Sequence, residues 1–159
     1  LGTALPKFTC GWNNTFKYKN FDLNFFFDAV YGNKIFNNTA LLLDKSNLKQ
    51  AKNGLRDYAY DRANYSNSTK VSDRYLQDGS FVRLSSASLG YTLSFPKTGW
   101  IQNLRVYVSG ANLFVLTNYT GYDPDVSSSA DMNGVRALGI DITSYPKART
   151  FLFGVNVTF

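Results

Sequence analysis

The side chains of this chain that could do chemistry are aspartates and tyrosines toward its C-terminal end. Carboxylate oxygens on a loop are ligands that calcium prefers, so the aspartates could hold calcium, although their spacing fits no EF-hand. A solvated polar loop is the other interpretation, and the spacing favours it. The tyrosines could stack on a sugar ring or pack at the rim of a fold. The aspartates are Asp123, Asp125, Asp131 and Asp141, and the tyrosines are Tyr119 and Tyr122.

Groups for acid–base or nucleophilic catalysis are scarce. The chain has no His and no Glu, so all 11 acidic residues are Asp. Without His, no Ser-His-Asp set can form, and the commonest acid–base group and metal ligand at neutral pH is missing. Cys10 is the single cysteine, which excludes an internal disulfide and a cysteine-based zinc cage. We therefore expect no enzyme, no cofactor and no metal site, with calcium in the loops as the open alternative.

The charge balance is basic, with 17 Lys and Arg and a formal charge of +6. Such a chain could bind nucleic acid or anionic lipid. The basic residues are scattered and never adjacent, so nucleic acid is not an expected partner. No stretch approaches the ~20 apolar residues of a membrane helix. The chain begins on Leu without an initiator Met, so we expect a piece of something longer or a processed product.

Alternation of apolar and polar residues predicts an all-β chain of five strands, because successive strand side chains point to opposite faces. The last strand is the clearest, with Phe151, Phe153, Val155, Val157 and Phe159 on one face and small, mostly polar residues on the other. The expected strands are Phe8–Lys19, Phe21–Tyr31, Ser80–Phe95, Ile101–Leu113 and Arg149–Phe159.

The connections between these strands alternate in length. Lys19-Asn20 is expected to make a two-residue turn in which Asn20 takes a positive φ, and Pro96–Gly99 a tight turn. A bulge near Ser85-Ser86 is expected to reset the register of the third strand. Two long polar loops follow, Gly32–Gly79 and Asn112–Pro146, the first with a weak helical pattern over Leu41–Leu55.

Short turns at one end and long loops at the other are typical of antiparallel transmembrane β-barrels of the outer membrane. An Arg or Lys facing mid-bilayer lipid costs about 2–4 kcal/mol, so charges should avoid the apolar face. Two arginines break this rule, Arg83 and Arg149, but both fall at strand ends where a long side chain can snorkel. The charges on the polar face are Lys17, Asp22, Asp28 and Arg105.

Aromatic residues are expected to form a girdle at the ends of the strands joined by short turns. Five strands alone would leave unpaired backbone groups in hydrocarbon, each costing several kcal/mol, so the membrane interpretation requires further strands. The alternative is a soluble β-sandwich, a glycan-binding module or adhesin, with the apolar face inside. The girdle residues are Tyr18, Phe21, Phe95, Trp100 and Phe159.

Several segments, in order and with compatible spacing, resemble one family of proteins. They are Tyr31–Asn37, Asp78–Leu84 leading into Leu89–Tyr91, Val106–Phe114 continuing to Tyr119–Pro124, and Ser144–Pro146 with the terminal Phe151, Gly154 and Phe159. The chain resembles the C-terminal end of SusC/RagA-type TonB-dependent outer-membrane transporters of Bacteroidetes-like bacteria. Asp125 stands where that family often has Glu.

The resemblance implies that residues 1–159 are the last five strands of a barrel of about 22 strands, whose plug and earlier strands lie upstream. It implies a multi-pass protein of the bacterial outer membrane that imports oligosaccharides or peptides. A surface lipoprotein of the SusD type would cap the barrel as a lid, and the TonB–ExbB–ExbD complex would drive import through the absent N-terminal part.

Particular residues are candidates for these roles. Tyr119, Tyr122 and Asp123 could contact the substrate or the lid, with packing at the rim favoured for the two tyrosines. Together with the alternating pattern, the resemblance predicts that Phe151, Phe153 and Phe159 form a C-terminal signal read by the barrel-assembly machinery.

Overall fold

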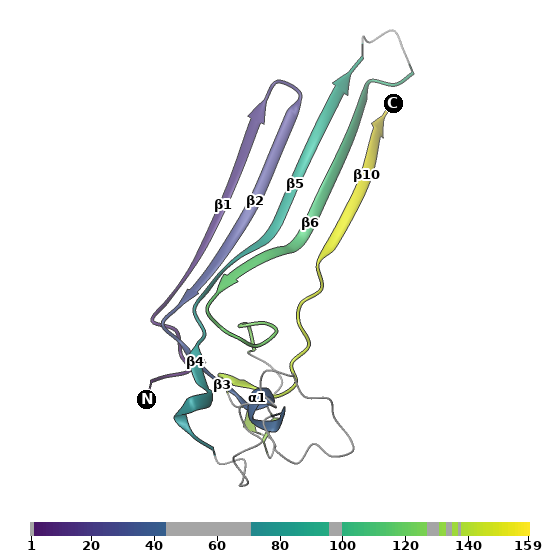
Figure 1. Ribbon diagram of the computed structural model, residues 1–159. Coiled ribbons are helices and arrows are strands. Elements are labelled where there is room, and N and C mark those ends of the chain that lie inside the picture. The colour runs from purple at the N-terminus through teal and green to yellow at the C-terminus, as the bar shows by residue number, and fades with distance from the viewer. Residues whose placement is uncertain (1, 44–70, 96–99, 127–130, 133–134, 137) are drawn as a thin grey trace, which may run out of the picture. The chain divides into compact units, whose positions relative to one another are not determined.

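The computed structural model describes residues 2–43, 71–95, 100–126, 131–132, 135–136 and 138–159. They divide into two compact units (Figure 1). We call one the sheet unit, which comprises Phe8–Val30, Phe81–Thr117 and Lys147–Phe159. We call the other the loop unit, which comprises Leu1–Lys7, Tyr31–Ser80 and Asn118–Pro146. None of the helices in the described ranges has the length and apolar character needed to cross a membrane.

The sheet unit is one antiparallel sheet with the strand order β1-β2-β5-β6-β10 (Figure 1). Four of its strands fall close to their predicted bounds, and β6 runs four residues further than expected. Long strands suit a membrane, since about eleven tilted residues cross its apolar band. The strands are β1 (Phe8–Tyr18), β2 (Phe21–Tyr31), β5 (Phe81–Ser94), β6 (Asn103–Thr117) and β10 (Thr150–Thr158).

The bulge expected near Ser85-Ser86 is present. In the pairing of β5 with β2, Phe26 lies opposite Ser86 and Phe27 opposite Leu84, so Ser85 is the extra residue. A second irregularity follows on β6, where Leu84 and Ser86 of β5 face residues three apart. Asn112, between those two β6 residues, has a φ of +53°, a left-handed conformation that Asn tolerates.

The bulge changes the face on which Arg83 lies, and the sequence-based assignment of Arg83 to the apolar face is wrong. Arg83 is the register partner of Asp28, which belongs to the polar face of β2, and it is only 3% exposed. The extra residue at Ser85 inverts the phase of the strand before it, because the side-chain period of a strand is two. Arg83 is therefore one more charge on the polar face and does not need to snorkel.

The turn between β1 and β2 has the predicted position but not the predicted conformation. Lys19 takes the positive φ, at 51°, and Asn20 does not. Thr92 N donates to Asn20 O over 2.9 Å, which ties the turn to β5. The turn predicted at Pro96–Gly99 lies outside the described residues.

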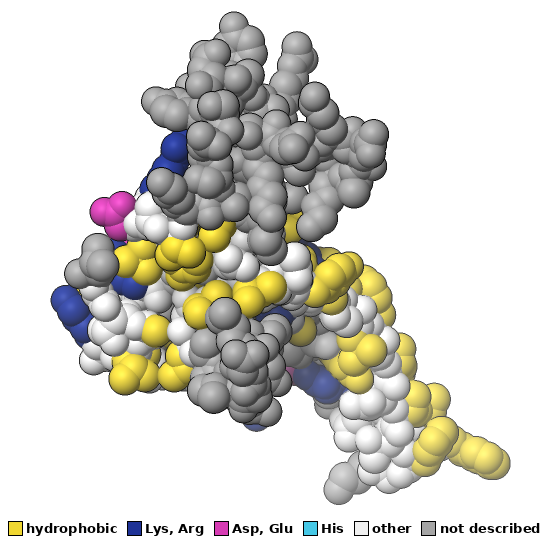
Figure 2. Space-filling view, turned by 90° about the horizontal axis from the view of Figure 1, so that it is seen from below, with side chains coloured by type: hydrophobic (Ala, Val, Ile, Leu, Met, Phe, Trp, Pro, Cys, Tyr) yellow, Lys and Arg dark blue, Asp and Glu magenta, His cyan; other side chains and the backbone are white. Residues whose placement is uncertain are grey.

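The apolar face of the sheet unit is exposed or half-exposed on all five strands. Phe153 is 78% exposed and Val155 61%, so neither points into a protein interior. Figure 2 shows apolar side chains gathered along one side of the strands at the lower right, with polar and backbone atoms on the other. The sheet unit itself contains one sheet and no second sheet within its described residues, whereas a soluble sandwich would require two. The exposed girdle residues Tyr18, Phe21, Phe95, Trp100 and Phe159 lie at the turn end of the strands.

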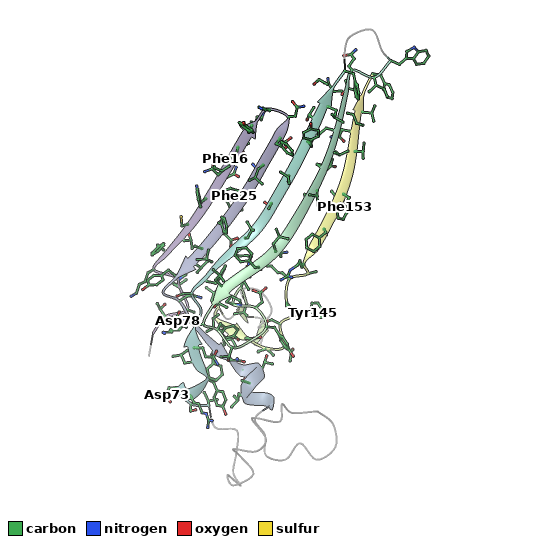
Figure 3. All side chains as sticks on the ribbon, turned by 45° about the horizontal axis from the view of Figure 1, so that its top comes forward. Phe16, Phe25, Asp73, Asp78, Tyr145 and Phe153 are labelled. Carbon is green, nitrogen blue, oxygen red and sulfur yellow. The ribbon has the colours of Figure 1, made fainter. Side chains whose placement is uncertain are left out.

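Aromatic rings link the strands across this face. The ring centroids of Trp12 and Phe27 lie 5.9 Å apart and stacked, and Phe25 meets Trp12 edge-on at 5.5 Å. Phe16 lies beside Phe25 at 5.9 Å, on the neighbouring strand (Figure 3). Phe27 in turn meets Phe114 of β6 at 6.1 Å. Cross-strand aromatic pairs of this kind stabilise a sheet without needing a buried core.

The loop unit has structure of its own, which the sequence pattern did not predict. A three-stranded sheet has the order β4-β3-β9, with β4 antiparallel and β9 parallel to β3. Of the helix expected over Leu41–Leu55, the part up to Leu43 is helical, in α1, which begins three residues earlier than expected, at Asn38; residues 44–55 lie outside the described part. The elements are β3 (Lys34–Asn37), α1 (Asn38–Leu43), η1 (Asp73–Tyr75), β4 (Leu76–Asp78), β7 (Asp131–Met132), β8 (Val135–Arg136) and β9 (Ile140–Asp141).

Candidate functional site

The polar face of the sheet unit carries an ion pair that spans three strands. Arg105 of β6 donates from Nε to Asp22 Oδ1 over 3.1 Å and from Nη2 to Asp22 Oδ2 over 2.5 Å. This two-pronged geometry is the strongest that an arginine and a carboxylate can adopt. Asp22 is on β2, so the pair crosses the intervening strand β5.

Gly90 provides the space for this crossing. It is the register partner of Asp22, and a Cβ built on it would lie 2.5 Å from Arg105 Nη2 and 2.6 Å from Asp22 Oδ1. Any other residue at this position would have to push the two charged groups aside. The absence of a side chain is thus what allows two strands that do not touch to share a charge pair.

Aromatic rings cover two further glycines on the same face. The ring of Tyr107 lies over its register partner Gly154, where a Cβ would collide with it. The ring of Phe26 lies over Gly11, where a Cβ would be 3.3 Å from the ring. The Arg105 guanidinium lies 4.9 Å from the centre of the Tyr107 ring, a cation–π distance. Small residues on the polar face of β1, β5 and β10 therefore lie beneath the large side chains of β2 and β6.

In the loop unit, the functional candidates gather around a buried carboxylate, that of Asp141. Asp141 is 2% exposed, and Tyr119 Oη donates to its Oδ2 over 2.5 Å. Its Oδ1 accepts from Thr39 Oγ1 at 3.2 Å and from Ser144 N at 3.3 Å. Thr39 Oγ1 also accepts from Thr143 N at 2.7 Å. Thr143 has a φ of +50°. We call Tyr119, Thr39, Thr143, Ser144 and Asp141 the Asp141 network.

Ionisation in this unit follows from its burial and hydrogen bonds. Burial, together with the hydrogen bond to Asp141, raises the pKa of Tyr119 far above its ordinary value, so the phenol stays protonated and donates. Asp78 Oδ1 accepts from Ser80 Oγ at 2.6 Å and from Ser80 N at 2.9 Å, and these bonds lower the pKa of Asp78. Both effects stabilise the observed hydrogen bonds at neutral pH.

The residues predicted to contact a substrate or lid differ in their access to solvent. Tyr119 and Asp123 are buried, at 5% and 7% exposure, whereas Tyr122 is 73% exposed. Asp123 Oδ1 accepts from Asp125 N at 2.9 Å, which shapes the turn that follows Tyr122. That any of the three touches a ligand stays a prediction, and only Tyr122 has a side chain open to one.

The aspartates considered for calcium have other surroundings in the described part of the chain. No group of three or more His, Cys, Asp or Glu there is placed to hold a metal ion. The carboxylate of Asp141 accepts the hydrogen bonds of its network, and that of Asp123 accepts a hydrogen bond from the backbone of the turn. The side chain of Asp131 lies outside what the structure describes.

Of the phenylalanines predicted to form the assembly signal, two lie on the apolar face of β10 and the third, Phe159, lies just beyond its end. Phe151, Phe153 and Phe159 are 59%, 78% and 77% exposed. Gln102 N donates to Thr158 O over 2.8 Å, so the chain remains attached to the sheet up to its last residues. The signal itself stays a prediction.

Sequence reasoning missed the centre of the loop unit and one exposed aromatic. Asp141 and Thr39 are 102 residues apart, and no local pattern announces their contact. Tyr145, labelled in Figure 3, is 92% exposed and follows Ser144 directly. The sequence singled out its segment only through the family resemblance. The signal that could have found it is a tyrosine between Ser and Pro in a loop, since binding residues often lie on loops.

The chain is similar to known proteins along its whole length, although no family model matches it. It is 39% identical over 170 residues to TonB-dependent receptor P3 of Formosa agariphila, which covers all of this chain and 17% of that protein. It is 30% identical over 165 residues to TonB-dependent receptor SusC of Bacteroides thetaiotaomicron, which covers 94% of this chain and 15% of SusC.

Solved structures share the fold. A chain of the RagAB peptide importer in its closed-closed state matches with a TM-score of 0.77 and 21% identity, over 99% of this chain and 18% of that one. The RagAB peptide transporter matches with a TM-score of 0.75 and 23% identity. These likenesses confirm the predicted fold class, an antiparallel all-β segment of a larger barrel. The chain spans about a sixth of the length of the curated relatives it matches.

Proposed function

Because the chain resembles, over its whole length, part of the SusC/RagA-type TonB-dependent receptors, we propose that it belongs to an outer-membrane nutrient importer. In this proposal residues 1–159 are the C-terminal part of the barrel, and the plug and earlier strands precede them. The sheet unit is a section of the barrel wall, and the loop unit consists of two extracellular loops together with the segment that precedes β1.

One observation carries the proposal: the two faces of the sheet unit differ in a way that suits lipid on one side and water on the other. The apolar face is exposed or half-exposed from β1 to β10 and carries no charge within these strands, and the polar face holds the Asp22–Arg105 pair and the buried Arg83. Lipid-facing strands of outer-membrane barrels have this alternation, with charge confined to the lumen. The free edges of β1 and β10 would pair with the remaining strands, since hydrocarbon does not tolerate unpaired backbone groups.

The connectivity supports the orientation. Both long connections, after β2 and after β6, leave the sheet at the same end and enter the loop unit, whereas the short turns lie at the other. Outer-membrane barrels have their long loops outside the cell and their short turns in the periplasm. Phe159 is then at the periplasmic end of β10, whereas Phe151 and Phe153 lie toward its extracellular end. In this proposal the assembly machinery reads the three residues before the strand enters the membrane.

The cargo is an oligosaccharide or a peptide in this proposal, and import needs two partners. A SusD-like surface lipoprotein would cap the barrel, and TonB–ExbB–ExbD would supply energy through the N-terminal part. The name of one structural neighbour, the RagAB peptide importer, supports a peptide as cargo, whereas the oligosaccharide and the lipoprotein lid rest on the resemblance to SusC-type receptors. Tyr122 is the residue of this chain proposed to touch cargo or lid, with Tyr119 and Asp123 acting through the backbone that carries it.

The experiment that tests the proposal uses the full-length protein in its own bacterium. A strain lacking the gene should lose uptake of fluorescently labelled oligosaccharides or peptides, and the tagged protein should co-purify with a surface lipoprotein after detergent extraction of outer membranes. Recovery of the protein in the soluble fraction without detergent would reject the membrane assignment. Normal uptake of every labelled cargo in the deletion strain would reject import.

A further inference from the structure

The two long connections of the chain are joined by hydrogen bonds at several points in the loop unit. Thr39 lies in the connection after β2, and Asp141 and Thr143 lie in the connection after β6. Thr39 Oγ1 bonds both, at 3.2 Å to Asp141 Oδ1 and 2.7 Å to Thr143 N. The two connections therefore share side-chain contacts between residues more than 100 positions apart.

Backbone pairing reinforces this junction. β3 from the first connection runs parallel to β9 from the second, with Phe36 opposite Ile140 and Asn37 opposite Asp141. Phe36 N donates to Gly139 O over 2.7 Å. Parallel pairing between such short strands needs support from side chains, because two bridges alone bury little surface.

A small apolar core is also shared. Ile35, from the first connection, is fully buried and clusters with Tyr119 and Val126 from the second. Gln77 Oε1 of the first connection accepts from both Thr120 N at 3.0 Å and Thr120 Oγ1 at 2.9 Å of the second. Each connection thus supplies part of a core and part of a hydrogen-bond network that it cannot complete alone.

We propose that Asp141 is a positioning residue that makes the two long connections one cooperative folding unit, so that neither keeps its structure when the other is released. The proposal concerns the coupling between loops and does not depend on what the protein imports. Asp141 suits this role because its buried carboxylate needs every one of its donors. A buried charge that loses a donor costs much more than an exposed one, so the network forms as a whole or opens as a whole.

The coupling would fix two exposed tyrosines of the loop unit, Tyr122 and Tyr145, relative to each other. Tyr119 packs its ring against Gly121, the residue before Tyr122, and Ser144, whose N donates to Asp141, directly precedes Tyr145. Tyr122 and Tyr145 therefore each follow a residue held by the Asp141 network. A ligand that binds Tyr122 would therefore meet Tyr145 in a fixed position, and the reverse.

The test places a reporter in one connection and the change in the other. In the full-length protein with Cys10→Ser, Ile35→Cys introduces a thiol at a fully buried position, and a membrane-impermeant maleimide on intact cells measures its exposure. Asp141→Ala and Tyr119→Phe should each raise the labelling rate of that thiol at least tenfold. Tyr145→Phe is the matched control, because it removes the same hydroxyl from a 92% exposed ring and should leave the rate unchanged.

The reciprocal arm and an unsubstituted reporter complete the experiment. Val126→Cys in the second connection should become labelled when Thr39→Val alters the first. Hydrogen exchange on purified protein, without added cysteines, should show residues 33–37 and 119–126 opening with equal free energies and losing protection together in Tyr119→Phe. Protection of residues 33–37 that survives both Asp141→Ala and Tyr119→Phe, by either readout, would overturn the coupling.

Discussion

Arg105 and Asp22 form a bidentate ion pair that crosses strand β5, and Gly90 of β5 lies beneath the pair. The shortest contact joins Arg105 Nη2 and Asp22 Oδ2 at 2.5 Å, and the two side chains are 31% and 26% exposed. A pair that is this exposed contributes little to stability on its own. Its importance lies in its position, because it joins β2 to β6 on the polar face of the sheet.

We predict that Gly90→Ala lowers the stability of the full-length protein by about 1–2 kcal/mol, because the added methyl displaces both charged groups. The urea midpoint of the protein in lipid vesicles measures the loss. Ser88→Ala, on the same face of β5, is the control. If the methyl acts through the ion pair, the cost of Gly90→Ala should shrink in an Asp22→Ala background; equal costs in both backgrounds would contradict this account.

The exposed face of β10 predicts a sharp contrast between neighbouring positions. Val155→Arg places a charge on the lipid-facing side and should cost about 2–4 kcal/mol near the membrane centre. Asn156→Arg places the same charge on the polar face, opposite Arg105, and should still cost less, because that face meets water rather than lipid. The folded fraction of the full-length protein, read from heat-modifiable gel mobility, measures both. Equal losses from the two variants would mean that the faces are wrongly assigned.

The C-terminal residue is predicted to matter for assembly more than for packing. Phe159 is 77% exposed, so Phe159→Asp removes few contacts from this chain. We expect it nevertheless to reduce the amount of full-length protein in the outer membrane several-fold, measured by surface biotinylation. Thr158→Asp adds the same charge one residue earlier and serves as the control. Unchanged surface levels in Phe159→Asp would remove the proposed assembly signal.

Tyr122→Ala is predicted to weaken cargo uptake or capture of the lid lipoprotein while the protein still reaches the surface. Its side chain is exposed, so its loss should not disturb the buried core of the loop unit. Uptake rate divided by surface amount is the relevant measurement. Val71→Ala is the control, since Val71 is also an exposed side chain of the same unit, at 77%. Normal uptake per molecule in Tyr122→Ala would exclude Tyr122 from the contact.

The raised pKa of Tyr119 predicts how the loop unit responds to alkali. The folded unit favours the protonated phenol, so its contribution to stability is fully present below the ordinary tyrosine pKa of about 10 and is lost as pH rises above that value. Exchange of residues 119–126 should therefore speed up above pH 10 beyond the intrinsic rate. Tyr119→Phe, which cannot ionise, should lack this component; the same increase in both proteins would contradict the assignment.

The strand pattern was predictable from particular residues. Alternation in Phe151 to Phe159 and in Phe21 to Tyr31 located β10 and β2, and the break at Ser85-Ser86 located the bulge. Such features are local, since the period of two acts over a few residues. The face of Arg83 is set by the register of β5 with β2, and the conformation of Lys19 depends on the pairing of its two strands.

The sequence by itself determined that the chain is built of amphipathic strands with charge on one face, because side-chain alternation needs no knowledge of distant contacts. Only the tertiary structure decided that Gly90 lies under an ion pair and that Asp141 joins Thr39, Tyr119 and Ser144. These contacts bring together residues between 3 and 102 positions apart, and they depend on sheet order and on β3–β9 pairing. A sequence writes a buried aspartate and a solvated aspartate in the same way. Only the tertiary structure shows that Asp141 is buried.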